Sequence, residues 1–300
     1  MAIPEFLKEK LENQYGKDLK EKILEGFFKK RKVTFRVNTL KANIEEIEEV
    51  LKKENIEFEK VDWSKEAFAL KNAREEDIQK LEIYEEGKIY LQSLSSMLPP
   101  IVLKPEEGKD ILDMAAAPGG KTTQMAALSN NKAHITACEM NNIRIEKLKY
   151  NVEKQGASCV YIMPKDSRQI DDFFSFDQIL LDSPCSGSGT LDEENINTEK
   201  YFTPKLIEKS TKSQYALLKK ALRILKPGHE MVYSTCSILK EENEEIVKKV
   251  LKETKAEIVP IDFEGIDCLP ILPVTLDGTL CVMPTEEYEG FYIAKIRRLK

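Results

Sequence analysis

The sequence has only two histidines in 300 residues, His134 and His229, and neither lies beside a candidate nucleophile in the chain. Because histidine is the side chain most often used as a general base, we predict that any catalysis by this protein proceeds without one. The six cysteines are scattered and form no C-x-x-C pair, which argues against a zinc cage or a disulfide framework. We therefore expect reduced thiols in a cytoplasmic protein.

The sequence also lacks long apolar runs and an excess of positive charge. No stretch of about 18 uncharged apolar residues occurs, and the opening MAIPEFLKEK carries charges where a signal peptide has its apolar region. Lys and Arg number 46 against 52 Asp and Glu, for a net charge of -6. This balance has the wrong sign for binding nucleic acid by bulk electrostatics, so such a role requires a local basic patch.

One basic cluster lies near the N-terminus and consists of Lys29, Lys30, Arg31 and Lys32, followed by Arg36. Phenylalanines flank the cluster, as in surfaces that bind nucleic acid. An exposed helix end whose lysines complement the helix dipole explains the same run equally well. Both interpretations stay open at the level of the sequence.

The spacing of apolar residues divides the chain into two regions. Helical spacing over residues 4–28 is followed by a strand, a helix and a second strand, which predicts a small α/β module. Pro99 and Pro100, followed by the polar stretch KPEEGKD, break the periodicity. We therefore expect an N-terminal region over residues 1–100 and a second domain over residues 101–300.

In the second region, five short apolar runs alternate with helical stretches: DILDM, HITACE, CVYIM, DQILLDS and EMVYST. This alternation is typical of buried parallel strands in a doubly wound α/β domain. Ligands bind such sheets at the carboxyl ends of the strands. The residues that follow each strand are therefore the candidate functional residues.

The first of these strands runs into a turn of small residues that opens a helix, where backbone N–H groups can approach a ligand closely. Glu139 follows the second strand, where a carboxylate can accept hydrogen bonds from both hydroxyls of a ribose. Asp166 follows the third strand and could accept from an exocyclic amine. Together these features predict an adenosine-containing cofactor, although a single carboxylate at such a position is more often a loop cap than a ligand. The turn consists of Ala115, Ala116, Ala117, Pro118, Gly119, Gly120 and Lys121.

The same turn nearly matches a phosphate-binding P-loop, with Ala115 in place of the first glycine, and Asp182 could then hold magnesium. Spacing alone leaves this ATPase interpretation open. Pro118 argues against it, because proline removes one N–H donor from a loop whose function is to donate N–H groups to phosphates. The dinucleotide fingerprint G-x-G-x-x-G is absent.

Two cysteines follow the fourth and fifth strands, Cys185 in DSPCSGSG and Cys236 in VYSTCS, and neighbouring strand ends would bring both to one cleft. Methylation of a pyrimidine at carbon 5 explains such a pair. One thiolate adds at carbon 6 and activates carbon 5, and a second group then removes the carbon-5 proton. Asp182 could hydrogen-bond to the ring and polarise it. We interpret the other four cysteines as small buried apolar side chains: Cys138, Cys159, Cys268 and Cys281.

Six motifs resemble, in order, those of the NOL/NOP/SUN family of S-adenosylmethionine-dependent RNA cytosine-5 methyltransferases. They are FRVNTL, YLQSLSSMLPP, DMAAAPGGKT, LLDSPCSGSG, VYSTCS with the following EEN, and EGFYIAKIRR, and they span residues 33–298. The resemblance implies a mostly parallel, Rossmann-like sheet of seven strands, the last antiparallel, after a small RNA-recognition-like module. It also implies methyl transfer to carbon 5 of a cytosine in structured rRNA or tRNA through a covalent cysteine adduct.

The resemblance further implies a role for each candidate residue. Cys236 would be the nucleophile, Cys185 the thiol that permits product release, and Asp182 a contact of both cofactor and target base. The residues alone leave the roles of the two thiols exchangeable. The residues implied to hold S-adenosylmethionine are the turn from Ala115 to Lys121 together with Glu139, Asp166 and Asp182.

Arg36 and the lysines before it are expected to contact RNA phosphates. The sequence departs from the family where His229 and Glu230 follow Gly228, and it stops at Lys300, where several relatives continue into a further RNA-binding domain. We therefore expect substrate choice to depend on the cleft and the first hundred residues, with modest, salt-dependent affinity. We expect a monomer that uses neither a metal nor a membrane. A P-loop hydrolase and a non-enzymatic RNA-binding assembly factor remain as alternatives.

Overall fold

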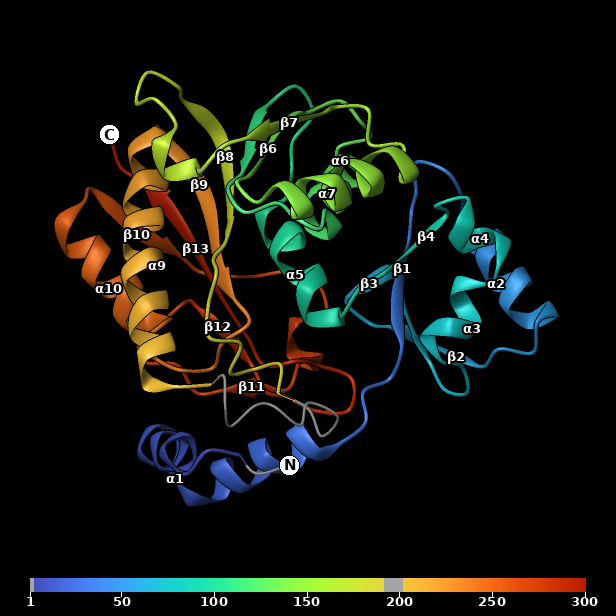
Figure 1. The fold of residues 1–300 in the computed structure, drawn as a ribbon, viewed down its shortest axis with the longest axis horizontal. Helices are drawn as coiled ribbons and strands as arrows, with labels where there is room; N and C mark the ends of the chain where they lie inside the picture. The colour runs from blue at the N-terminus through green and yellow to red at the C-terminus, as the bar shows by residue number, and fades with distance from the viewer. Residues whose placement is uncertain (1–2, 192–201) are drawn as a thin grey trace.

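The structure is a computed structural model that describes residues 3–191 and 202–300. It contains a small sheet near the N-terminus and a large sheet built from the rest of the chain (Figure 1). In the described part of the chain, no helix is both long and apolar enough to cross a membrane.

Helix α1 (Glu5–Phe28) precedes both sheets and bends at Gly16, whose φ of 79° is outside the helical range. Its apolar side chains, including Leu7, Leu11 and Phe27, are buried in the core of the large sheet. The predicted helical segment is therefore confirmed, and it packs on the large sheet although the small sheet follows it in the chain.

The small sheet has the strand order β2-β3-β1-β4 and is antiparallel throughout. Phe35 and Phe68 stack in its core with ring centroids 5.3 Å apart. The sequence predicts β1, α2 and β2 but not β3, which lies between the two strands. The elements of this region are β1 (Thr34–Val37), α2 (Ile44–Lys53), β2 (Phe58–Val61), β3 (Ser64–Leu70), α3 (Glu75–Gln79), α4 (Glu82–Glu85) and β4 (Ile89–Leu91).

Helix α5 (Leu94–Leu103) runs through Pro99 and Pro100, where the sequence predicts a break. Proline has no N–H, so the carbonyl of Ser96 loses its usual helical partner. The side chain of Gln92 donates to that carbonyl at 3.0 Å. Both prolines are buried, and the helix packs on the large sheet. The two prolines therefore lie inside a buried helix and not in an exposed linker.

The large sheet has the order β11-β12-β13-β9-β8-β5-β6-β7. Strands β9, β8, β5, β6 and β7 are parallel, and β13 is antiparallel to β9, as expected. The described residues give nine strands where seven are expected, because β10 and β12 pair with different parts of β13 and β11 pairs with β12. The strands are β5 (Asp110–Asp113), β6 (His134–Glu139), β7 (Val160–Pro164), β8 (Phe176–Asp182), β9 (Leu225–Thr235), β10 (Ala256–Val259), β11 (Ile271–Leu272), β12 (Leu280–Val282) and β13 (Phe291–Arg298).

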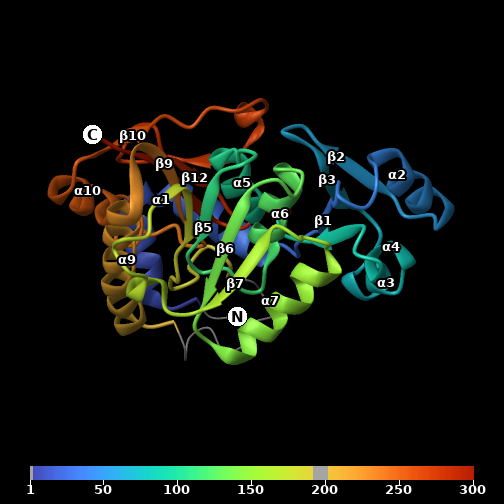
Figure 2. The ribbon, with the colours of Figure 1, turned by 90° about the horizontal axis from the view of Figure 1, so that it is seen from above.

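Helices cover both faces of this sheet (Figure 2). Helices α5 and α6 pack on one face, and α1, α9 and α10 pack on the other. The order of the strands reverses between β5 and β8, which is where a doubly wound sheet binds its ligand. The remaining helices are α6 (Gly120–Leu128), α7 (Asn142–Lys154), η1 (Ser167–Gln169), α9 (Pro204–Ile224), α10 (Glu244–Glu253) and η2 (Ile266–Cys268).

Candidate active site

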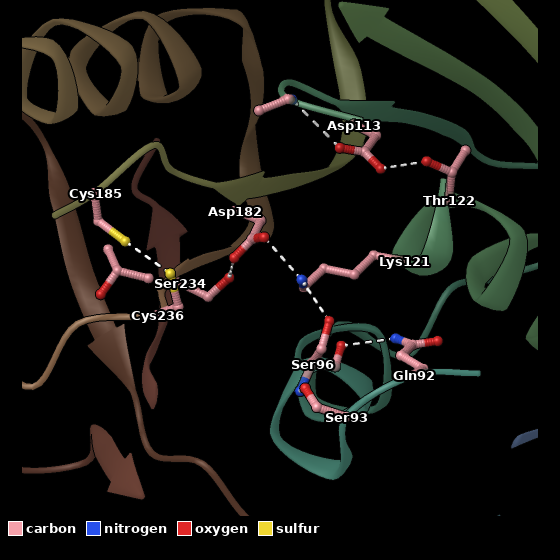
Figure 3. A network of polar contacts seen from close by, with 12 residues as sticks. Gln92, Ser93, Ser96, Asp113, Lys121, Thr122, Asp182, Cys185, Ser234 and Cys236 are labelled. Carbon is pink, nitrogen blue, oxygen red and sulfur yellow. Dashed lines mark hydrogen bonds and ion pairs between the residues drawn. The ribbon is translucent and has the colours of Figure 1, made fainter. Parts of the chain in front are cut away.

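The loops after β8 and β9 bring the two predicted cysteines together, with 3.0 Å between the sulfurs of Cys185 and Cys236 (Figure 3). Backbone hydrogen bonds join the loops, since the N–H of Ser183 donates to the Ser234 carbonyl at 2.8 Å and the N–H of Gly189 to the Cys236 carbonyl at 3.0 Å. The hydrogen bond with Cys236, together with burial, raises the pKa of Cys185 well above its usual range. Cys185 therefore holds its proton more firmly than an ordinary thiol.

A cavity of about 480 Å³ lies at the carboxyl ends of β5 and β8. Cys236 and Asp182 line it, together with the small residues of the turn after β5 and with Gln92 and Ser96 from the segment around α5. Cys185 is not among the residues that line this cavity, although its sulfur lies 3.0 Å from that of Cys236. The cavity thus joins the predicted cofactor turn to one of the two thiols.

Asp182 and Lys121 form an ion pair inside this cavity (Figure 3). The ammonium of Lys121 lies 2.7 Å from Oδ2 of Asp182 and donates to the hydroxyl of Ser96 at 2.8 Å. The hydroxyl of Ser234 donates to Oδ1 of Asp182 at 2.8 Å. Burial opposes the charge of Lys121, but the carboxylate of Asp182 outweighs it and raises the pKa of Lys121, and the charge of Cys236 acts in the same direction. The ammonium is thus held by protein groups, whereas a P-loop lysine binds phosphate.

Asp113 ends β5, lines the cavity and contacts the turn that follows it. It is fully buried, and it accepts hydrogen bonds from the Thr122 hydroxyl at 2.7 Å and from the Ala115 N–H at 3.4 Å. Burial raises its pKa to about 6. The sequence alone did not predict a role for Asp113, Ser96 or Ser234. The position of Asp113 at a strand end next to the turn was an available signal, and Ser96 lies within the motif YLQSLSSMLPP, to which no individual roles were assigned.

Glu139 and Asp166 lie at the ends of β6 and β7, where the sequence places them, but neither lines the cavity. Oε1 of Glu139 accepts from the N–H groups of the next two residues at 2.9 Å each, and Oε2 lies 3.2 Å from Arg144. Asp166 caps η1 and pairs with Arg168 at 2.6 Å, which lowers its pKa. Both carboxylates act as loop caps here, and their predicted contacts with a nucleoside stay predictions.

The basic cluster near the N-terminus is divided between surface and interior. Lys29 and Lys30 are exposed. Arg31 donates to the carbonyls of Thr285 and Tyr288 at 2.5 and 2.7 Å. Lys32 forms ion pairs with Glu59 at 3.1 Å and with Glu287 at 2.5 Å. Arg31 and Lys32 thus connect this part of the chain to the segment before β13, and Lys32 also pairs with β2. The two exposed lysines stay candidates for RNA contact.

The prediction that Arg36 contacts phosphate is wrong, because its side chain is only 3% exposed. Its guanidinium donates to Gln92 at 2.9 Å, to the Gly120 carbonyl at 3.1 Å and to Thr123 at 2.8 Å, and it lies over the ring of Tyr90. Burial lowers its pKa to about 10. Arg36 therefore connects β1 of the small sheet to the start of α6.

The remaining cysteines differ from the expectation at one position. Cys138 and Cys281 are buried as predicted and Cys159 is half-buried, but Cys268 is exposed because η2 lies on the surface. Both histidines lie near the amino ends of β6 and β9, at the opposite edge of the sheet from the thiols. Among the residues that the structure describes, no group of three or more His, Cys, Asp or Glu side chains could hold a metal ion.

Two family models match the chain. Residues 100–297 match the family described as 16S rRNA methyltransferase RsmB/F. Residues 3–76 match the ferredoxin-like domain of the RsmF/B-like methyltransferases. Between them, the matches cover the large sheet and most of the small sheet.

Individual proteins match over most of the chain. Ribosomal RNA small subunit methyltransferase F of Shewanella oneidensis is 34% identical over 277 residues, which are 89% of this chain and 57% of that protein. The chain thus spans little more than half the length of this relative. The tRNA (cytosine(49)-C(5))-methyltransferase of Pyrococcus abyssi is 34% identical over 303 residues, 97% of this chain and 96% of that protein. The crystal structure of NSun6 from Pyrococcus horikoshii with SFG superposes with a TM-score of 0.86 at 25% identity, covering 99% of this chain and 98% of that one.

Proposed function

The chain belongs to the RsmB/F family of 16S rRNA methyltransferases, and from this we propose that it transfers a methyl group from S-adenosylmethionine to carbon 5 of a cytosine in RNA. The names of the relatives from Shewanella and Pyrococcus support rRNA or tRNA as the substrate. The observation that carries the proposal is the pair of thiols 3.0 Å apart, with Cys236 lining the same cavity as Asp182 and the turn after β5.

The residues around the turn suit S-adenosylmethionine, which supplies an electrophilic methyl group when bound. The three alanines from Ala115 to Ala117 leave the backbone open to the cavity, and a Cβ at Gly120 would lie 3.1 Å from the ring of Tyr90. We assign Glu139 to the ribose hydroxyls and Asp166 to the adenine amine. The Glu139 assignment requires the half-exposed Arg144 to release Oε2. The relative solved with SFG, an analogue of S-adenosylmethionine, supports this cofactor.

We assign Cys236 as the nucleophile. Its position in the cavity lets it reach a base, and two neighbours favour its thiolate: the ammonium of Lys121 attracts the negative charge, and the thiol of Cys185 donates a hydrogen bond to it. The thiolate adds to carbon 6, a new S–C bond forms, and the electron pair of the C5–C6 double bond moves toward carbon 5. Asp182, held by Lys121 and Ser234, hydrogen-bonds the ring and polarises it during attack.

Cys185 takes the carbon-5 proton after methyl transfer. The hydrogen bond and charge of Cys236 help to raise the pKa of Cys185 in the free protein. Once the Cys236 sulfur is bonded to carbon, that sulfur carries no negative charge, so the Cys185 thiol can lose its proton to solvent. The resulting thiolate removes the carbon-5 proton, the S–C bond breaks, and Cys236 leaves as a thiolate.

Transfer of a labelled methyl group from S-adenosylmethionine to unmodified rRNA and tRNA transcripts, with nucleoside analysis, tests the proposal. We expect label in 5-methylcytidine with the wild type and none with Cys236→Ser. Cys185→Ser should leave protein bound to RNA on a denaturing gel, and Cys159→Ser, away from the cavity, should behave like the wild type. Label at another ring position would refute carbon 5 as the target, and hydrolysis of magnesium-ATP without binding of S-adenosylmethionine would support the P-loop alternative.

A further inference from the structure

A buried carboxylate that the chemistry above does not use connects the two cysteine loops. Glu242, in the turn before α10, is completely buried. Its Oε1 accepts from the N–H of Ser186 at 2.7 Å, and its Oε2 accepts from the hydroxyls of Ser186 at 2.5 Å and Ser237 at 2.6 Å. Ser186 directly follows Cys185, and Ser237 directly follows Cys236. One carboxylate therefore contacts the residue next to each thiol.

Further hydrogen bonds hold this carboxylate and the two loops. The side chain of Gln214, on α9, donates to Oε1 of Glu242 at 3.4 Å and to the carbonyl of Pro184 at 3.1 Å. The hydroxyl of Ser188 lies 2.8 Å from that of Ser237, and the hydroxyl of Tyr233 donates to the backbone carbonyl of Glu242 at 2.6 Å. The carboxylate is thus the centre of a network that includes both loops and the strand β9.

The charge of this carboxylate opposes ionisation of Cys185. A carboxylate that accepts four hydrogen bonds has its acceptor sites filled and is stabilised as an anion. The hydrogen bond with Cys236 and burial raise the pKa of Cys185, and the charge of Glu242 adds to that rise. A negative charge at this place therefore opposes ionisation of Cys185, while Lys121 on the other side favours the thiolate of Cys236.

We propose that Glu242 is a positioning residue that holds the two thiols in hydrogen-bonding contact and selects Cys236, in preference to Cys185, as the thiol that ionises. The catalytic meaning of this choice rests on the proposed function, because the choice decides which thiol attacks the base and which thiol keeps its proton. The choice itself is a property of the free protein and can be measured without RNA or cofactor.

The test compares the rates at which iodoacetamide alkylates Cys185 and Cys236 in the full chain. The reaction is carried out at pH values from 6 to about 10, and peptide mass spectrometry measures the alkylation of each cysteine. The wild type is expected to react first at Cys236. In Glu242→Gln the charge that opposes ionisation of Cys185 is gone, so the ratio of Cys185 to Cys236 alkylation should rise about threefold or more. Glu245→Gln removes the same charge from an exposed position on α10 and should keep the wild-type ratio.

An unchanged ratio in folded Glu242→Gln would overturn the proposal, as would an equal rise in Glu245→Gln. Because replacing a buried carboxylate can prevent folding, Ser186→Ala provides a second test. It keeps the charge and removes only the hydroxyl that fastens the Cys185 loop, so the hydrogen bond between the thiols should weaken and the ratio should rise about twofold. An unchanged ratio in Ser186→Ala would also overturn the positioning role.

The two proposals fail in different ways. If the wild type transfers no methyl group but the alkylation ratio rises in Glu242→Gln, the proposed function is wrong and the positioning role stands. If the wild type methylates cytosine and the ratio does not move, only the positioning role is wrong. The pH at which Cys236 alkylation is half-maximal provides a further measurement in Glu242→Gln. If Glu242 had a merely structural role, this midpoint would stay at its wild-type value.

Discussion

Replacing Lys121 by methionine removes the positive charge from the cavity while keeping much of the side-chain volume. In the structure the ammonium lies 2.7 Å from Asp182 and 2.8 Å from the Ser96 hydroxyl, and its side chain is 13% exposed. The substitution leaves Asp182 with the hydrogen bond from Ser234 and removes the positive charge of Lys121 that attracts the Cys236 thiolate. We therefore expect slower methyl transfer and slower alkylation of Cys236 in Lys121→Met than in the wild type.

The distance sets the size of the effect. Two unit charges 2.7 Å apart attract by about 6 kcal/mol at an effective dielectric constant of about 20. Removing both groups from water cancels part of that attraction, so losing one partner costs about 3 kcal/mol. If the full loss is felt in the transition state, methyl transfer slows about a hundredfold. The midpoint of Cys236 alkylation should rise by about one pH unit, because the thiolate loses its cation.

Two assays measure these effects separately. Single-turnover transfer of labelled methyl groups gives the rate of the chemical step, and iodoacetamide alkylation across pH gives the midpoint for Cys236. Lys52→Met, which removes an exposed lysine from α2, is the matched control. The reasoning is refuted if Lys121→Met transfers methyl groups as fast as Lys52→Met, or if its alkylation midpoint stays at the wild-type pH.

Three further predictions concern stability and RNA binding. Burial raises the pKa of Asp113 from 3.8 to about 6, so its contribution to stability falls as pH rises from 4 to about 6. In urea unfolding, Asp113→Asn should remove roughly 3 kcal/mol of that pH dependence. An unchanged pH dependence would contradict this prediction. A Cβ at Gly189 would lie 2.0 Å from the Gly290 carbonyl, so Gly189→Ala should lower the free energy of unfolding by about 2 kcal/mol or more, and a loss near zero would show that the backbone adjusts freely. The double variant Lys29→Gln and Lys30→Gln should weaken RNA binding and reduce the salt slope by up to about 1.4 in fluorescence anisotropy, whereas an unchanged slope would mean that neither lysine meets phosphate.

The sequence predicted the five central strands of the large sheet and the helices between them. The inner strand β8 is buried over almost its whole length, so it appears in the chain as a continuous apolar run that can be recognised without its neighbours, whereas β7 at the edge of the sheet is only partly buried. The short strands β3, β10, β11 and β12 were not predicted. They are pieces of two to seven residues whose pairing depends on partners elsewhere in the chain.

Tertiary packing overrode two local signals. Pro99 and Pro100 are strong helix breakers in isolation, but the apolar environment of α5 and the Gln92 side chain stabilise a helix that contains them. Arg36 belongs to a basic cluster in the sequence, yet every residue of β1 is buried, so its guanidinium finds its partners inside the protein. In both cases the deciding contacts come from residues that a local pattern does not include.

The sequence by itself determined which residue types could carry the chemistry, because the turn after β5, Asp182 and each cysteine stand directly after a recognisable strand. Only the tertiary structure decided how they meet. Cys185 and Cys236 are 51 residues apart, and Lys121 and Asp182 are 61 apart, so their contacts depend on which strands are neighbours in the sheet. Glu242 reaches both cysteine loops for the same reason, since strand order and the burial that comes with it are properties of the folded sheet and of no single segment.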